Sequence, residues 1–185
     1  MSSPSLAHRV LTATLEAPPR LGGVRVLAID GPSGSGKSTL ARAVVEHHPG
    51  CALISTDDFA TWDDPVSWWS RLENGVLTPL RNGQSGTYQR MEWPGGLPRL
   101  GEWITVGVPD ILVIEGVSAG RRAVHDRLSL LVWVDFASAS ARLERAVARD
   151  GERSRPHLLR WQQFEDGWFA VDDPATRAGL KFHSG

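Results

Sequence analysis

The chain of 185 residues is 41% hydrophobic and 22% charged, and its formal net charge is −1. This size and composition indicate one globular domain of residues 1–185, and the near-neutral charge gives no electrostatic case for a nucleic-acid partner. A single cysteine excludes an internal disulfide, and no stretch holds the ~18 consecutive apolar residues of a membrane span. We therefore expect a cytoplasmic protein without a membrane partner.

Near the N-terminus, four apolar side chains are spaced as on one face of a helix. They are Leu6, Val10, Leu11 and Leu15. This pattern predicts an amphipathic helix packed on the domain, and the segment lacks the continuous apolar core of a secretory signal. Residues 24–30 then form a β-branched, apolar run, which is typical of a buried parallel strand.

Residues 31–39 read Gly-Pro-Ser-Gly-Ser-Gly-Lys-Ser-Thr and match the P-loop pattern G-x-x-x-x-G-K-[ST]. Glycines let the backbone N–H groups point at phosphate oxygens, and the helix predicted for residues 39–46 adds the positive end of its dipole. Lys37 would reach the β- and γ-phosphates, and the Ser38 hydroxyl would bind Mg²⁺. A glycine-rich surface loop is the alternative, but it need not lie between a strand and a helix. The expected nucleotide-binding residues are Gly31, Ser33, Gly34, Ser35, Gly36, Lys37, Ser38 and Thr39.

A second apolar run, residues 51–55, leads directly into two aspartates, Asp57 and Asp58. Because the carboxyl ends of parallel strands face the ligand crevice, a carboxylate here can take a proton from an attacking hydroxyl or hold Mg²⁺ through water. Adjacent side chains point in different directions, so we expect one of the two to serve. An aspartate pair that caps the next helix is the alternative.

The segment of residues 61–109 differs in composition from the rest of the chain. It holds five of the eight tryptophans, the single tyrosine and many glycines and prolines. An insertion of this length between two core strands predicts a substrate-binding region, whereas the alternative is a small hydrophobic cluster that closes the fold. The five tryptophans are Trp62, Trp68, Trp69, Trp93 and Trp103.

Residues 111–115 form another buried strand, which ends in Glu115. A strand-terminal acid beside a P-loop is typical of the Mg²⁺ sites of P-loop enzymes, so Ser38 and Glu115 are the predicted metal ligands. Gly116 would let the backbone turn close to the phosphates.

The last third of the chain is predicted to hold a strand at residues 129–135, a helix at residues 138–150 and a weak final strand near residues 178–183. Strands that alternate with helices predict an α/β domain with a mostly parallel sheet. In the helix, Arg142, Arg145 and Arg149 share one face because their spacings are three and four. Such arginines can neutralise a phosphoryl group during transfer, or they can form a solvated basic face.

These motifs, in this order, resemble the uridine kinase and phosphoribulokinase family of P-loop kinases from about Val24 to Phe169. The resemblance implies a P-loop NTPase fold: three α/β/α layers, a five-stranded, mostly parallel sheet and a helical lid at about residues 142–160. It also implies ATP and Mg²⁺ as cofactors. The implied activity is transfer of the γ-phosphate of ATP to a hydroxyl of a nucleoside or a similar small acceptor.

The same resemblance implies roles for individual residues. Asp57 is expected to be the catalytic base, and Lys37, Arg145 and Arg149 are expected to act on the transferred phosphoryl group. The stretch Gly-Thr-Tyr-Gln-Arg at residues 86–90 takes the place of the family's P-x-Y-D element, with glutamine instead of aspartate. The expected substrate-binding residues are Asp57, Phe59, Tyr88, Arg90, Trp93 and Arg142.

A second hypothesis is a nucleotide-dependent ATPase or switch that acts on a protein partner. It predicts hydrolysis without a small acceptor and a guanine-recognition sequence N-K-x-D, which the chain lacks. The third hypothesis, a binder without catalysis, is disfavoured because Lys37, Ser38, Asp57 and Glu115 are all present. We expect a monomer or a homodimer.

Overall fold

The computed structural model describes residues 3–136 and 138–183, and these contain a central sheet of five strands in the order β2-β5-β1-β6-β7. Every described pairing in this sheet is parallel. Strand β1 is in the middle, so the loop that follows it opens at the carboxyl edge between β5 and β6, where ligands bind in such sheets. The strands are β1 (Arg25–Asp30), β2 (Cys51–Ser55), β5 (Ile111–Glu115), β6 (Leu130–Asp135) and β7 (Leu180–His183).

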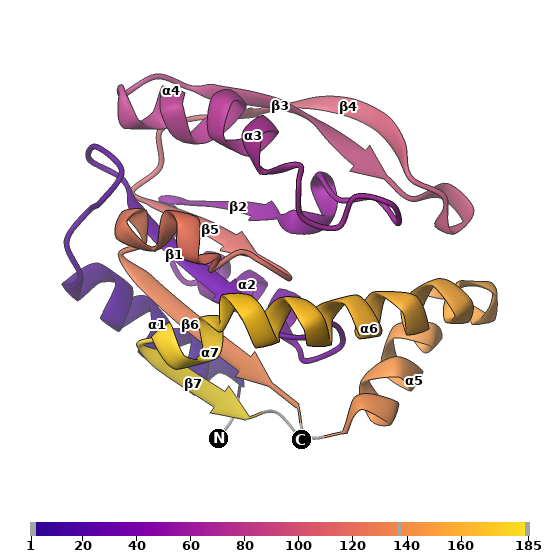
Figure 1. Cartoon of the computed structure of the whole chain (residues 1–185). Coiled ribbons are helices and arrows are strands. Elements are labelled where there is room, and N and C mark those ends of the chain that lie inside the picture. Colours follow the sequence, from indigo (N-terminus) through magenta and orange to yellow (C-terminus); the bar gives the residue numbers. More distant parts are fainter. Residues whose placement is uncertain (1–2, 137, 184–185) are drawn as a thin grey trace.

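Two hydrophobic clusters lie on opposite faces of the sheet because successive side chains along a strand point to opposite sides. In β1, Leu27 belongs to one cluster and Val26 to the other. The cluster of Leu27 is covered by α1 (Ser3–Glu16) and α2 (Lys37–Glu46), which pack together. The cluster of Val26 is covered by the insertion and by α6 (Arg155–Asp172), as Figure 1 shows. This arrangement confirms the predicted three-layer α/β architecture.

The insertion predicted at residues 61–109 forms a layer of its own, in which an antiparallel hairpin and short helices lie together above β2 and β5 (Figure 1). Stacked rings join it to the core: the ring centroid of Phe59 is 5.2 Å from that of Trp68 and 4.7 Å from that of Tyr88. Part of the aromatic composition therefore closes the fold. The elements are α3 (Trp69–Leu72), η2 (Glu73–Leu77), α4 (Thr78–Arg81), β3 (Gly86–Glu92), η3 (Pro94–Gly96) and β4 (Arg99–Val106).

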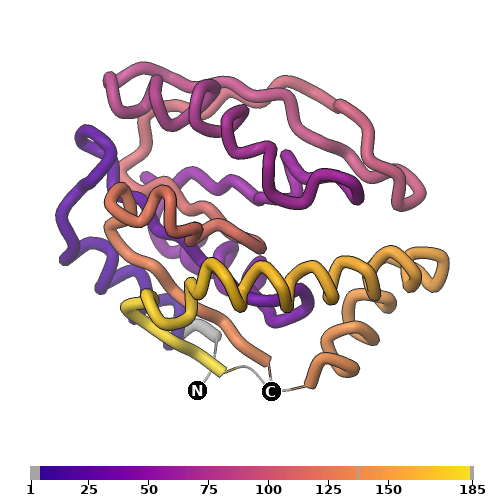
Figure 2. The backbone as a smooth tube through the Cα atoms, viewed as in Figure 1, coloured from indigo at the N-terminus to yellow at the C-terminus, as the bar shows by residue number. Residues whose placement is uncertain are grey.

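Two helices follow β6 in the region of the predicted lid. Ser138 is the N-cap of α5, because its side chain accepts the backbone N–H of Ala141, and Gly151 follows the last turn of the helix. Figure 2 shows the chain turning at the end of α5 and α6 running back across the sheet toward α7. No described helix combines the length and apolarity needed to cross a lipid bilayer. The remaining elements are η1 (Thr56–Asp58), η4 (Arg122–Arg127), α5 (Ala139–Asp150), η5 (Glu152–Ser154) and α7 (Pro174–Arg177).

Candidate active site

The loop between β1 and α2 has the tight backbone that its glycines require. Gly31 has φ 144°, and a Cβ atom there would lie 2.0 Å from the carbonyl oxygen of Val134. Gly34 has φ 77°, and its Cβ would lie 2.7 Å from the carbonyl oxygen of Arg142. Both positions therefore exclude any side chain, and the loop leads into the N-terminus of α2, where an anion is favoured.

Lys37 and Ser38, in the first turn of α2, are held by two separate contacts. The buried Nζ of Lys37 donates to the carbonyl oxygen of Pro32 at 2.8 Å, which keeps the ammonium against the loop. The hydroxyl of Ser38 donates to Oε2 of Glu115 at 3.1 Å. The structure thus brings together the two predicted metal ligands, and both offer the oxygen atoms that Mg²⁺ prefers.

Glu115 is a buried acid at the end of β5. Burial raises the pKa of its carboxyl, the nearby positive charge of Lys37 lowers it, and the negative charge of Asp57 raises it again. Asp57 and Glu115 line the same cavity, and Lys37 lies near enough to lower the pKa of Glu115. A divalent cation would relieve the repulsion between the two acids.

The two aspartates after β2 point in different directions, as predicted. Asp57 lies in the turn η1, where its backbone N–H donates to the Ser55 side chain, and it lines a cavity. Asp58 accepts the hydroxyl of Tyr88 at 2.6 Å, and burial is the main cause that raises the pKa of this carboxyl. Asp57 is therefore the acid available to a ligand, whereas Asp58 holds the insertion.

A cavity of about 580 Å³ is lined by the P-loop, the insertion, α5 and α6. Its lining includes Ser33, Ser38 and Glu115 and also three indoles, which we call the tryptophan wall: Trp62, Trp93 and Trp161. Asp57 also lines it, and α5 with the following turn contributes Arg149, Asp150 and Ser154. One space thus contains predicted phosphate-binding residues, an acid and an aromatic wall.

The tryptophan wall is fixed in place by its own hydrogen bonds. The indole N–H of Trp62 donates to the carbonyl oxygen of Gly96 at 2.8 Å, and that of Trp93 donates to the carbonyl oxygen of Asp57 at 3.2 Å. The rings of Trp62 and Trp93 meet edge to face, with centroids 4.9 Å apart. These two indoles therefore offer a ligand their ring carbons, because their single donors are already used.

Four of the six predicted substrate-binding residues lie elsewhere: Phe59, Tyr88, Arg90 and, on α5, Arg142. Phe59 and Tyr88 are core residues, 1% and 4% exposed, so their rings pack in the fold and do not line the cavity. Arg90 forms an ion pair with Glu102, with 2.9 Å between Nη2 and Oε1. Trp93, in contrast, lies on the cavity wall as expected of a ligand contact.

The three predicted arginines of α5 also separate. Arg149 lines the cavity, and its guanidinium makes two hydrogen bonds of 2.6 Å to Asp150. Arg142 is buried, and its Nη1 donates to the carbonyl oxygen of Phe136 at 2.7 Å. The guanidinium of Arg145 lies over the Phe136 ring, 5.0 Å from its centroid. In this arrangement Arg149 alone of the three lines the cavity.

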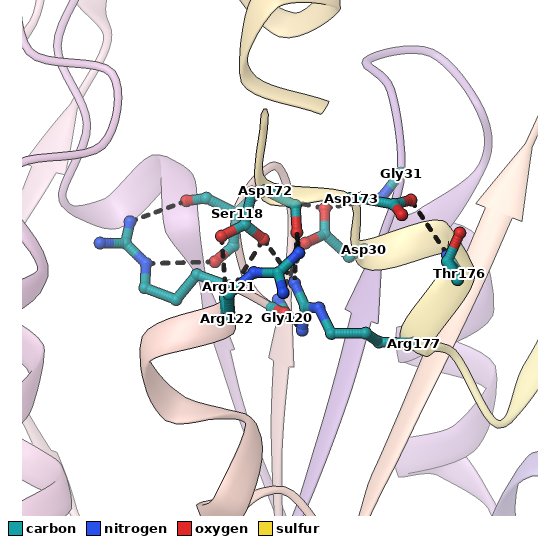
Figure 3. A network of polar contacts seen from close by, with 10 residues as sticks. All are labelled: Asp30, Gly31, Ser118, Gly120, Arg121, Arg122, Asp172, Asp173, Thr176 and Arg177. Atoms are coloured by element: carbon teal, nitrogen blue, oxygen red, sulfur yellow. Dashed lines mark hydrogen bonds and ion pairs between the residues drawn. The ribbon is translucent and has the colours of Figure 1, made fainter. Parts of the chain in front are cut away.

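Asp30, the last residue of β1, organises the base of the P-loop, and the sequence analysis did not single it out. Its carboxylate accepts the N–H groups of Gly31 at 2.7 Å, Ser118 at 3.1 Å and Gly120 at 2.8 Å. Figure 3 shows these contacts beside Arg121, whose Nη2 donates to the side chain of Ser118. Burial raises the pKa of Asp30 to about 6. Its position just before the P-loop was the available sequence signal.

Glu165 and the tryptophans Trp62 and Trp161 were also missed as individual residues. Glu165 and Trp161 lie four residues apart on α6, so they share one face of that helix. Trp62 and Trp161 line the cavity, and the carboxylate of Glu165 contacts Ser33 of the P-loop. A tryptophan and an acid at helical spacing were the only local signal for the pair on α6.

No protein-family model and no curated protein matches the chain. Solved structures do match. One is described as "a Possible Uridine Kinase" from Bacillus stearothermophilus, with a TM-score of 0.68 and 18% identity over 96% of this chain and 97% of that chain. Another is D-glycerate 3-kinase from Cryptococcus neoformans, with a TM-score of 0.59 and 14% identity over 88% and 86%.

The fold and the site together define the class: the chain has the P-loop α/β kinase fold. Within that class, the neighbours include uridine kinase-like and glycerate kinase structures, so the predicted resemblance is confirmed at the level of the fold.

Proposed function

We propose that this chain is a kinase that transfers the γ-phosphate of ATP to a hydroxyl of a small molecule. One observation carries the proposal: a single cavity holds Ser33 and Ser38 of the P-loop, Glu115 and Asp57. Direct transfer requires that donor and acceptor meet in one shielded space, because water otherwise competes for the phosphoryl group.

The donor end has the groups that a magnesium nucleotide needs. Backbone N–H groups of residues 31–39 and the ammonium of Lys37 would bind the phosphates. The oxygens of Ser38 and Glu115 would hold Mg²⁺, which supplies positive charge at the β- and γ-phosphates when bound. This donor set supports ATP and Mg²⁺ as the cofactors.

The chemistry at the acceptor is assigned to Asp57. Its carboxylate would orient the acceptor hydroxyl and take its proton as the oxygen attacks phosphorus. Arg149 on the same cavity would stabilise the negative charge of the transferred group. Arg142 and Arg145 could join it only if their side chains left the Phe136 carbonyl and ring, a rearrangement of the kind that accompanies closure of a site over its substrate.

The tryptophan wall supports an acceptor with a flat or ring-shaped body. Trp62 and Trp93 present ring carbons, and a ring that stacks on them gains contact area and favourable aromatic geometry. A nucleoside fits this description, and so does another compact hydroxylated ring compound. We therefore place the acceptor against this wall with its hydroxyl toward Asp57.

An ATP-consumption screen against nucleosides, sugars, vitamin-like alcohols and hydroxylated antibiotics tests the proposal. We expect ATP turnover that depends on one acceptor class and yields a phosphorylated acceptor, detected by mass spectrometry. ATP hydrolysis that is equal with and without every acceptor would contradict a kinase and favour an ATPase. If nucleosides fail while another alcohol is phosphorylated, the kinase stands and the nucleoside is excluded.

A further inference from the structure

Glu165 on α6 is an acid with no assigned task in the proposed reaction, and it is only 1% exposed. Both of its carboxylate oxygens lie 3.1 Å from the backbone nitrogen of Ser33, and the Ser33 hydroxyl donates to Oε1. Ser33 belongs to the P-loop, 132 residues earlier in the chain. A buried acid of α6 is therefore bonded directly to the P-loop.

The same carboxyl also lies close to the tryptophan wall. Trp161 lies one helical turn earlier on the same face of α6, near enough for its side chain to lower the pKa of Glu165. The Trp161 ring lines the cavity and meets Trp62 edge to face, with centroids 5.8 Å apart. Glu165 thus adjoins both Ser33 of the P-loop and Trp161 of the tryptophan wall.

The hydrogen-bond partners explain why this position holds an acid. The backbone N–H and the hydroxyl of Ser33 both point at it, and an ionised carboxylate accepts both because it has no hydrogen to donate. Burial raises the pKa of Glu165, while the charge of Lys37, the hydrogen bonds from Ser33 and the side chain of Trp161 act in the opposite direction. In Glu165→Gln, the amide N–H₂ would face the donor groups of Ser33. Two donors cannot bond to each other, so one of these contacts would be lost.

The rest of α6 is anchored without Glu165. At the C-terminal end of the helix, the carboxylate of Asp172 accepts the backbone N–H of Arg122 at 2.9 Å and the guanidinium of Arg177 at 2.5 Å, as Figure 3 shows. These contacts attach the end of α6 to η4 and α7. What Glu165 adds is a direct contact between the middle of α6, one turn after Trp161, and the P-loop.

We propose that Glu165 is a positioning residue that couples the nucleotide loop to the tryptophan wall by holding Ser33 and Trp161 in a fixed relation. The role of this coupling in catalysis rests on the proposed function. If nucleotide binding displaces Ser33, the bonded carboxylate of Glu165 moves with it and shifts Trp161 on the same helix. The kinase would thereby align its acceptor wall only when the donor is bound.

The test follows Trp161 directly, in protein labelled with 5-fluorotryptophan. The eight tryptophans give separate fluorine NMR signals, and the Trp161→Phe variant assigns the one of interest. The probe is a non-hydrolysable ATP analogue with Mg²⁺, added to saturation. We expect the Trp161 signal to move in the wild type and its displacement to fall at least about threefold in Glu165→Gln. Asp166→Asn, which makes the same charge change one residue later on the exposed face of α6, should respond as the wild type does.

Two outcomes overturn the coupling: a Trp161 signal that does not respond in the wild type, or one that responds equally in Glu165→Gln at saturation. Tighter analogue binding by Glu165→Gln with an unchanged Trp161 response would show instead that the carboxylate merely competes with phosphate. None of these readouts needs an acceptor. A chain that couples nucleotide to Trp161 but phosphorylates nothing would sink the proposed function and leave this inference standing.

If Glu165→Gln does not fold, a double-mutant cycle replaces it. Ser33→Ala removes the hydroxyl donor, and Trp161→Phe removes the indole donor while keeping a ring. Because both side chains adjoin the same carboxylate, their effects on analogue affinity should be non-additive by at least about threefold. Strictly additive effects would overturn the proposal.

Discussion

The carboxylate of Asp30 accepts the backbone N–H of Gly120 at 2.8 Å, although the two residues are 90 positions apart. Because Asp30 also accepts the N–H of Gly31, this one side chain joins the start of the P-loop to the turn after β5. The same turn follows Glu115 at the end of β5, so the P-loop and the candidate metal ligand are both joined to Asp30.

The buried carboxyl of Asp30 predicts that the stability of the fold depends on pH. The pKa of Asp30 is raised from an ordinary 3.8 to about 6, so between these values the folded state keeps a proton that the unfolded chain has lost. The free energy of unfolding should therefore fall as pH rises, by about 2 kcal/mol for this group between pH 4 and 6. Urea unfolding of the wild type and Asp30→Asn at each pH measures it.

Other acids with raised pKa values also make the free energy of unfolding fall as pH rises. The relevant quantity is therefore the difference in this free energy between the wild type and Asp30→Asn. The wild type should lose stability relative to Asp30→Asn as pH rises from 4 to 6. Asp166→Asn on the surface of α6 serves as the control, and its difference from the wild type should stay flat. A flat difference for Asp30→Asn would show that the carboxyl is not held as described.

The chain's two lysines offer a matched pair for testing the P-loop. Lys37→Ala removes the ammonium held against the loop, whereas Lys181→Ala removes an exposed one on β7. We expect Lys37→Ala to lower acceptor-dependent turnover at least about a hundredfold, because a charge aimed at the transferred phosphoryl group is lost. Lys181→Ala should match the wild type, and equal turnover in all three proteins would refute the assignment.

The metal assignment predicts a change in Mg²⁺ requirement. Glu115→Gln keeps the shape of the side chain and removes its charge, so the Mg²⁺ concentration for half-maximal turnover should rise at least about tenfold. Without Mg²⁺, nucleotide affinity should hold or improve, because a negative charge near the phosphates is gone. Calorimetry with and without Mg²⁺ checks both statements, with the exposed Glu46→Gln on α2 as control. An unchanged Mg²⁺ requirement would remove Glu115 from the site.

The Tyr88→Phe variant distinguishes a packing role of Tyr88 from a substrate-binding role. The hydroxyl of Tyr88 donates to the half-buried carboxyl of Asp58, and its ring stacks on Phe59. Tyr88→Phe should therefore lower the free energy of unfolding by about 1–3 kcal/mol and leave the acceptor KM unchanged. A raised KM with unchanged stability would instead support the substrate contact that the resemblance implied.

These residues show which parts of the site the sequence predicts and which it does not. The P-loop, Asp57 and Glu115 follow from local patterns, since each lies at the end of an apolar strand. The insertion is harder, because composition does not tell which face of a hairpin is buried: Tyr88 lies in the core, whereas Trp103 is 69% exposed.

Contacts between distant segments account for the rest. Glu165 meets Ser33 across 132 residues, and Asp30 meets Gly120 across 90. No local periodicity encodes either pair, because each depends on how the layers pack. The arginines of α5 share a predicted helical face, yet Arg142 and Arg145 turn to Phe136 because its carbonyl and ring are within reach.

The central claim, that Asp57 activates an acceptor beside bound nucleotide, is tested most directly by single-turnover phosphoryl transfer in Asp57→Asn and Asp58→Asn. With the acceptor found by the screen, Asp57→Asn should lower the transfer rate at least about a hundredfold while its affinity for a non-hydrolysable ATP analogue stays within about twofold of the wild type. Asp58→Asn should lose stability and keep the greater part of its transfer rate. Full transfer by Asp57→Asn, or a hundredfold loss confined to Asp58→Asn, would contradict the account.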